Sequence, residues 1–366
     1  MRISNKYNSI LLILGILIVF SSALINLKEK SNVNTNPKNA ESPSNTPDTK
    51  PLTSGCWTAN FIAIHHNWTT PCPYIKPGLG TSDSPHIIEN GTIDAINSPI
   101  DAGILIKDST DYFIIRNCTI RNANSDYGGI CLYNTTHGRI ENSTWISNNK
   151  FGIYIYNSSS NTIFDNKING NENSGIYLLA KSYNNTIINN TLSNNNNYGV
   201  LLFSCDNNTI RGNTFEYNGW SGILISDSNK TIIYGNTINN NNDYGIWLNG
   251  ACYNTIYDNT INNNVFGVLL VTYSNNNKVF NNIFVSNYEC IVEDYTCTGN
   301  ILTPNTCNPK SNNPYTSPSD DDDSDNGHKS ATITGYDLLI VSLISVLISG
   351  IISLIFLKNR TKRVKY

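Results

Sequence analysis

Glycine recurs through the middle of this 366-residue chain at nearly constant intervals, and this period constrains the fold more than any other feature. The gaps between eight successive glycines are 26, 23, 23, 24, 23, 23 and 22 residues. Most of them open one short phrase, such as Gly-Ile-Tyr-Ile at 152 and Gly-Ile-Trp-Leu at 245. A fixed period of this length indicates one structural unit stacked on copies of itself. The recurring glycines are Gly103, Gly129, Gly152, Gly175, Gly199, Gly222, Gly245 and Gly267.

Two further patterns share this period. Asn-Thr-Ile recurs between Asn161 and Asn254, and an asparagine two residues before an apolar residue recurs between Asn166 and Asn282, with Cys118 in the same slot earlier. Each period therefore holds three short apolar-alternating stretches separated by turn residues, which is typical of strands. We predict an all-β fold, a parallel β-helix of about eight coils of 22–26 residues, with equivalent strands paired about 4.8 Å apart.

The repeated positions each have a physical explanation. Ile, Leu or Val one and three residues after each glycine is expected to fill the interior, and the glycines are expected to adopt turn conformations with positive φ. Stacked asparagines at one turn are expected to hydrogen-bond from coil to coil. Because the apolar rows keep register with the asparagines, we reject low-complexity disorder for this Asn-rich region.

Apolar segments near both ends predict membrane contact. Residues 1–29 contain an apolar run and are interpreted as a signal peptide or an N-terminal membrane anchor, with the choice left open. Residues 336–357 are predicted to be a transmembrane helix, because Leu338 to Leu357 is an apolar run of 20 residues. The basic tail at 358–366 is then cytoplasmic, by the positive-inside rule, and the body lies outside the cell.

The other segments complete a domain plan. Residues 30–55 form a polar linker and residues 317–332 an acidic one, which includes Asp320 to Asp323. A Ca²⁺ site in that aspartate run is the weaker interpretation, because loop-forming ligand spacing is missing. The remaining parts are an N-terminal cap at 56–80, the repeats at 81–287 and a Cys-containing C-terminal cap at 288–316. A net charge of −3 with 14% charged residues argues against a nucleic-acid partner.

Nine cysteines and many sequons suit an extracellular body. Cys56 and Cys72 are a candidate pair for the N-terminal cap, and two of Cys290, Cys297 and Cys307 for the C-terminal cap, while Cys118, Cys205 and Cys252 are read as small buried residues. Asn117, Asn142 and Asn189 are sequons that we judge too enclosed to be modified. The glycosylation candidates are Asn67, Asn90, Asn134, Asn157, Asn184, Asn207 and Asn229.

The stretch Gly80-Thr-Ser-Asp-Ser-Pro-His-Ile-Ile-Glu-Asn and the coils that follow resemble NosD-like right-handed β-helix repeat proteins. The resemblance covers about Thr81 to Asn287 and implies a right-handed helix, and the two-anchor layout looks like archaeal surface versions. It implies three roles: copper delivery, polysaccharide cleavage as in distant lyases and hydrolases, or an uncharacterised surface role.

Candidate chemistry is sparse along the coils. Glu141 stacked on Asp165 one coil later, with Arg116 in the coil before, is the alternative catalytic set, and the same residues would also form a neutralising ladder on a solvated turn. Copper is weakly supported, because the only methionine is Met1 and the adjacent His65 and His66 would point to opposite faces of a strand. We therefore expect no resident metal or other cofactor.

An outward aromatic face is the strongest functional candidate. The residue two positions after each glycine points outward, and together with the residue two positions further on it forms a long apolar face. Such a face could stack on sugars, dock a protein or another copy, or be covered by residues 52–80 or the C-terminal tail. We predict a non-enzymatic, membrane-anchored surface module that binds carbohydrate or a surface protein, with a polysaccharide lyase or glycoside hydrolase as the alternative. The predicted ligand-binding residues are Tyr154, Tyr156, Tyr177, Phe203 and Trp247.

Overall fold

The computed structural model describes residues 55–57, 61–66, 68, 74–100, 102–123, 127–147 and 149–310, with only the backbone at 55–57 and 145. The chain divides into two units, Met1–Lys50 and Pro51–Tyr366, and all described residues belong to the second. Among the described residues, no helix is long and apolar enough to cross a membrane. Both predicted membrane segments lie outside these residues.

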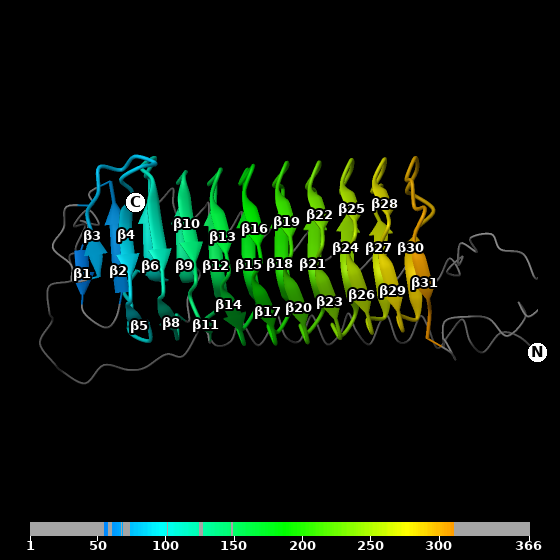
Figure 1. Cartoon of the computed structure of the whole chain (residues 1–366), viewed down its shortest axis with the longest axis horizontal. Coiled ribbons are helices and arrows are strands. Elements are labelled where there is room, and N and C mark those ends of the chain that lie inside the picture. Colours follow the sequence, from blue (N-terminus) through cyan, green and yellow to red (C-terminus); the bar gives the residue numbers. More distant parts are fainter. Residues whose placement is uncertain are drawn as a thin grey trace, which may run out of the picture. The chain divides into compact units, whose positions relative to one another are not determined.

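The described residues form a parallel β-helix, which confirms the predicted fold class. Three sheets, here called A, B and C, contain one strand from each coil, and Figure 1 shows these strands following one another in sequence order. Sheet A contains β1 (Gly55–Trp57), β2 (Phe61–His65), β6 (Ala102–Lys107), β9 (Gly128–Tyr133), β12 (Phe151–Tyr156), β15 (Ser174–Leu179), β18 (Tyr198–Phe203), β21 (Ser221–Ser226), β24 (Tyr244–Asn249), β27 (Phe266–Val271) and β30 (Glu289–Glu293).

The strands of the other two sheets are shorter. Sheet B contains β3 (Ile75–Lys76), β4 (His86–Glu89), β7 (Phe113–Arg116), β10 (Gly138–Glu141), β13 (Thr162–Phe164), β16 (Thr186–Ile188), β19 (Thr209–Arg211), β22 (Ile232–Tyr234), β25 (Thr255–Tyr257) and β28 (Lys278–Phe280). Sheet C contains β5 (Thr92–Asp94), β8 (Thr119–Arg121), β11 (Trp145–Ser147), β14 (Lys167–Asn169), β17 (Thr191–Ser193), β20 (Thr214–Glu216), β23 (Thr237–Asn239), β26 (Thr260–Asn262), β29 (Ile283–Val285) and β31 (Thr306–Asn308).

Strands outside the glycine-marked coils extend the sheets at both ends. β2 pairs in parallel with β6 before the first such coil, and β30 pairs in parallel with β27 after the last. The first strands of sheets A and B are antiparallel: β1 pairs with β2 and β3 with β4. An antiparallel strand covers the open hydrogen-bonding edge that a stack of parallel strands would otherwise leave.

The interior is filled by stacked aliphatic rows, as predicted. Ile153 and Ile155 on β12 are in register with Ile176 and Leu178 on β15, and all four are fully buried. Sheets B and C each add one inward residue per coil, such as Ile163 and Ile168. Every coil thus contributes about four inward side chains, and stacking joins them into one continuous core.

Asparagine ladders line the turns inside the helix, which confirms the predicted coil-to-coil hydrogen bonding. Nδ2 of Asn213 donates to Oδ1 of Asn236, and Nδ2 of Asn236 donates in turn to Oδ1 of Asn259. The same Nδ2 atoms also donate to backbone carbonyls one coil earlier, for example Asn236 to Ile210 O at 3.0 Å. The slot assigned to Cys118 is confirmed too, because its N–H donates to Ser143 and the N–H of Ser143 to Asn166.

The recurring positions require glycine for a different reason from the predicted one. None of the eight recurring glycines has a positive φ, so turn conformation is not the reason for glycine at these positions. A Cβ at Gly245 would lie 2.6 Å from the Gly267 carbonyl oxygen and 2.6 Å from a methyl group of Ile261 on sheet C. Glycine is needed because the backbone of sheet A approaches the next coil and the inner row of sheet C too closely for any side chain. Asparagine, aspartate and other residues take the positive-φ turn positions, as at Asn189 and Asp258.

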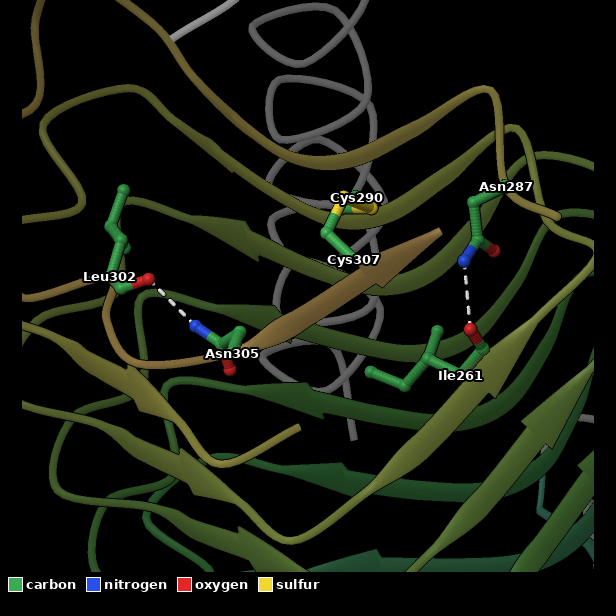
Figure 2. Close-up of a disulfide and its surroundings, with 6 residues drawn as sticks. All are labelled: Ile261, Asn287, Cys290, Leu302, Asn305 and Cys307. Carbon is green, nitrogen blue, oxygen red and sulfur yellow. Dashed lines mark hydrogen bonds between the residues drawn. A yellow bond between two sulfur atoms is a disulfide. The ribbon is translucent and has the colours of Figure 1, made fainter. Parts of the chain in front are cut away.

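A disulfide between Cys290 and Cys307 joins β30 to β31 at the C-terminal end. Figure 2 shows it near the amide of Asn287, which donates to Ile261 O at 2.7 Å. Cys290 follows Gly267 in the glycine column, and Cys307 follows Phe284 in the inner row of sheet C. The two positions that approach each other closely in most earlier coils, such as Gly245 and Ile261, are thus covalently linked here. Of the last three cysteines, Cys290 and Cys307 are therefore the bonded pair, and Cys297 is free and buried.

Candidate functional site

The predicted ligand face on sheet A is mostly buried, which corrects its interpretation as an open surface. Tyr154 and Tyr177 are each 8% exposed and Trp247 is 4% exposed, while Tyr156 and Phe203 are half-buried. They belong to a second hydrophobic cluster, built from sheet A and the residues next to its strands. Because neighbouring coils are close, the rings pack on one another, with centroids of Tyr154 and Tyr177 5.6 Å apart.

Burial also changes the chemistry of these side chains. Desolvation raises the pKa of Tyr154 and of Tyr177 far above the ordinary tyrosine value, so both hydroxyls stay protonated even in alkaline solution. The indole N–H of Trp247 is buried and has no hydrogen-bond partner among the described residues. Coverage of this face by the C-terminal tail falls outside the described residues. The outer row of sheet A is therefore a packing element rather than a bare binding surface.

The alternative catalytic set does not assemble as expected. Glu141 is in register with Phe164, and Asp165 follows one position later, exposed and with φ 53° in the turn. The predicted stacking of Glu141 on Asp165 is therefore wrong by one residue. The carboxylate of Glu141 instead accepts a hydrogen bond from Arg139 on its own strand.

Arg116 lies between two glutamates in register but bonds to only one of them. Its guanidinium contacts the carboxylate of Glu89 at 2.7 and 2.8 Å, and Lys76 contacts the same carboxylate. Hydrogen bonds from Lys76 first and Arg116 second hold the pKa of Glu89 below its ordinary value. This cluster ties the antiparallel strand β3 to the first coils. The predicted neutralising ladder of Glu141, Asp165 and Arg116 does not form either, because Arg116 pairs with Glu89 and Glu141 with Arg139.

Desolvation raises the pKa of two other carboxylates, Asp243, which is half-buried, and Asp227, which is exposed at its turn. Asp227 follows the end of β21, whereas Asp243 precedes the start of β24. A strand of six residues spans about 20 Å, which is too long for the pair of carboxylates that glycoside hydrolysis requires. Neither residue has a second acid beside it among the described contacts.

The outer face of sheet B carries an aromatic column that the sequence analysis missed. The rings of Tyr234 and Tyr257 stack with centroids 5.0 Å apart, and those of Tyr257 and Phe280 with centroids 5.4 Å apart, each pair within 5° of parallel. All three side chains are half-buried. Burial, together with the neighbouring Tyr234, raises the pKa of Tyr257 above the ordinary tyrosine value. The signal was present in the sequence, because each of these residues directly follows the inward apolar residue of its strand, Ile233, Ile256 or Val279.

A row of mostly threonines lies beside this column, two residues earlier on each strand. Thr162, Thr186 and Thr209 are in register on consecutive coils, and the row continues through Ile232, Thr255 and Lys278. The threonines are half-buried and Ile232 is 40% exposed. Sheet B therefore presents hydroxyl groups, ring edges and a few cations, Arg211 among them, in lines along the helix axis.

The turn after β2 brings together two histidines that were expected to point apart. His65 ends the strand, and His66 leaves it with φ 61°. One ligand atom from each imidazole and one from Asp108 lie within 4.8 Å of one another. Adjacent strand residues face opposite sides, but the left-handed turn at His66 rotates its ring back, with the two ring centroids 4.6 Å apart. The reason given above against a metal site therefore does not hold.

The remaining predicted positions fall as follows. Asn90, Asn134, Asn157, Asn184 and Asn207 are exposed and Asn229 is half-buried, while Asn67 lies outside the described residues. Asn117, Asn142 and Asn189 are equally exposed, so their exclusion as enclosed sites was wrong. Cys118 and Cys205 are buried as predicted, and Cys252 is half-buried. Cys72 and the side chain of Cys56 lie outside the described part of the chain, so their pairing stays a prediction.

Comparisons with known proteins agree with this architecture. The profile of the family described as "Right handed beta helix region" matches residues 78–219 and 184–307. The mannuronan C-5 epimerase AlgE6 A-module of Azotobacter vinelandii is similar at 18% identity and TM-score 0.44, over 59% of this chain and 65% of that one. No curated protein matches the chain.

Two further solved structures are similar in fold. The enzymatically active domain of bacteriophage CBA120 tailspike protein 2 shares 14% identity, with TM-score 0.46, over 63% of this chain and 38% of that one. DFA-IIIase from Arthrobacter chlorophenolicus A6 shares 14% identity, with TM-score 0.47, over 56% of this chain and 60% of that one. The chain spans less than two thirds of the length of all three structures, and no activity is transferred from them.

Proposed function

We propose that this chain, which belongs to the right-handed β-helix family, is a non-enzymatic surface module that binds a glycan along the outer face of sheet B. The family profile covers most of the described body. The column of Tyr234, Tyr257 and Phe280 is the observation that carries this proposal. Tyrosine combines an apolar ring with a polar hydroxyl, which suits a sugar with both C–H faces and hydroxyl groups. We also propose that, within this family, the chain is related to the NosD-like proteins that residues 81–287 resemble.

The geometry of the stack specifies how a glycan would be held. Since the rings cover one another's faces, they present edges and hydroxyls outward rather than a flat stacking platform. The threonine row adds a second line of hydroxyls at the coil spacing of about 4.8 Å. An extended chain lying along the axis would thus meet donors and acceptors at every coil. Arg211 and Lys278 favour a neutral or acidic polysaccharide over a basic one.

Substitution of the column tests this proposal. We would measure retention of neutral and acidic polysaccharides on the full-length protein, and new reducing ends in the same samples. The double variant Tyr234→Thr/Tyr257→Thr keeps β-forming residues on the strands and should lower retention at least tenfold. Tyr295→Thr is the matched control, since Tyr295 is 80% exposed and lies outside the column.

Each other outcome has a defined meaning. Retention that is equal in the double variant and the wild type would refute binding at sheet B. New reducing ends would show an enzyme and refute the non-enzymatic assignment. If no polysaccharide is retained, the glycan proposal fails and a protein partner becomes the hypothesis to test.

Membrane anchoring completes the proposal and rests on sequence patterns alone. The apolar run at 338–357 and the basic tail at 358–366 would hold the β-helix outside the cell, on the acidic linker at 317–332. Some exposed sequons would then be glycosylated. Removing residues 336–366 should release the protein from the membrane fraction; a truncated protein that stays there would refute anchoring by this segment.

A further inference from the structure

The turn after β2 holds a cluster of metal-binding side chains independent of the sheet B face. His65 Nε2 lies 3.1 Å from Oδ2 of Asp108, with the two side chains 34% and 23% exposed. His66 is exposed, and its nearest ring nitrogen lies within 4.8 Å of both partner atoms. All three donors are therefore open to solvent at one edge of sheet A.

From this convergence of two imidazoles and one carboxylate we propose that His65, His66 and Asp108 form a binding site for a divalent transition-metal ion. Imidazole nitrogen with carboxylate oxygen is the donor set of borderline ions such as Zn²⁺, whereas Ca²⁺ and Mg²⁺ prefer oxygen alone. Three protein donors leave a coordination position for water or for an external ligand.

The backbone places these donors without strand distortion. His65 is in register with Lys107, so His66 and Asp108 occupy the same turn position on neighbouring coils. Both residues have left-handed backbones, with φ 61° and 53°. Histidine and aspartate are among the few residues that tolerate this region. Two successive coils thus turn their side chains the same way at the same point.

The carboxylate is held in an orientation suited to binding. Asn134, one coil further on, donates its amide to Oδ1 of Asp108 at 2.8 Å, which leaves Oδ2 toward His65. Such outer hydrogen bonds fix ligand orientation in metal sites. The one opposing charge in the described surroundings is Lys107, whose Nζ lies 3.9 Å from Oδ2 and 5.3 Å from the Tyr133 ring centroid.

Only a small movement of one side chain would bring the three ligand atoms to the spacing found around a bound Zn²⁺ ion. Ligand atoms around a tetrahedral Zn²⁺ ion lie about 3.3 Å apart, given metal–ligand bonds of about 2.0–2.1 Å. His65 and Asp108 already meet this spacing at 3.1 Å. The exposed ring of His66 has to approach by about 1.5 Å at most, which a side-chain rotation provides.

The test measures Zn²⁺ binding by the full-length protein, stripped with a chelator, through competition with a chromogenic chelator. We expect one Zn²⁺ per chain at this site. His66→Asn and Asp108→Asn should each weaken it at least tenfold, and both keep a residue that accepts positive φ. His137→Asn is the matched control, because His137 has φ 61° and lies outside the cluster.

Two results would overturn the proposal. One is an absence of Zn²⁺ binding by the wild-type protein. The other is equal binding by wild type and the His66→Asn/Asp108→Asn variant, which would assign the ion to other groups, such as the aspartates at 320–323. Thermal melting with and without Zn²⁺ gives a second measurement, since an ion bound only by the folded state raises the Tm of the wild type and not that of the double variant.

Discussion

Asn213 and Asn236 are joined twice across neighbouring coils: both the side-chain Nδ2 and the backbone N–H of Asn213 donate to Oδ1 of Asn236, at 3.0 and 2.8 Å. Nδ2 of Asn236 donates in turn to Oδ1 of Asn259 and to the carbonyls of Ile210 and Tyr234. One buried amide therefore satisfies polar groups on three consecutive coils. Asparagine is needed at this position because it supplies a donor and an acceptor together.

Asn236→Ala should be strongly destabilising. It leaves the backbone N–H of Asn213 unpaired in the interior, which costs about 1–3 kcal/mol for one buried unsatisfied group, and it removes the hydrogen bonds that Nδ2 of Asn236 donates. Thermal and urea unfolding followed by circular dichroism would measure it. Asn242→Ala, at an exposed asparagine six residues away, is the control and should stay within about 0.5 kcal/mol of wild type. Equal stability of the two variants would contradict the ladder.

Gly222→Ala should destabilise the protein through contact rather than through backbone conformation. The new Cβ would lie 2.7 Å from a methyl group of Ile238 and 2.9 Å from the Gly245 carbonyl oxygen. Overpacking of this kind costs about 1–3 kcal/mol. The comparison is Gly235→Asn, at a glycine with φ 62° and open space around it, where equivalent coils already carry asparagine. If urea unfolding shows Gly235→Asn to be the more damaging change, turn conformation matters more than close approach.

Loss of the Cys290–Cys307 disulfide should lower stability by about 3 kcal/mol, as expected for a closed loop of this length. Cys290→Ser/Cys307→Ser should melt at a lower temperature than wild type, and a reducing agent should lower the Tm of wild type but not of this variant. Cys252→Ser, at a free cysteine, should respond to reduction as the wild type does. A variant that still responds to reduction would point to a second disulfide.

Stability should fall in acid because of Glu89. The pKa of Glu89 in the folded protein lies below the ordinary value of 4.5 that it has in the unfolded chain. Its contribution to the free energy of unfolding is therefore complete above pH 4.5 and is lost as the pH falls through the lower, folded-state pKa. Glu89→Gln should therefore be less stable at pH 7 and show a shallower loss of Tm between about pH 5 and pH 3. Glu172→Gln, at an exposed glutamate, should keep the wild-type slope. Parallel Tm curves for Glu89→Gln and wild type would refute this role.

The sequence alone determined the repeat and what it builds. Strict alternation separates inward from outward residues within one strand, so the period and the rows of Ile153 and Ile176 were sufficient to predict a three-stranded coil and a continuous core. The asparagine ladders followed for the same reason, since residues one period apart stack directly. The repeated pattern is sufficient to predict a contact wherever a residue packs against the equivalent residue of the next coil.

Only the tertiary structure decided what lies opposite non-equivalent residues. A shift of one position separates Glu141 from Asp165, and a left-handed turn brings His66 back beside His65. The glycine column is constrained by Ile261 on another sheet, and the same contact, with cysteines in the last coil, becomes the disulfide. The register of neighbouring strands and the φ angle of a turn residue depend on how side chains from different parts of the coil pack together. A pattern of residue types along the chain does not contain that information.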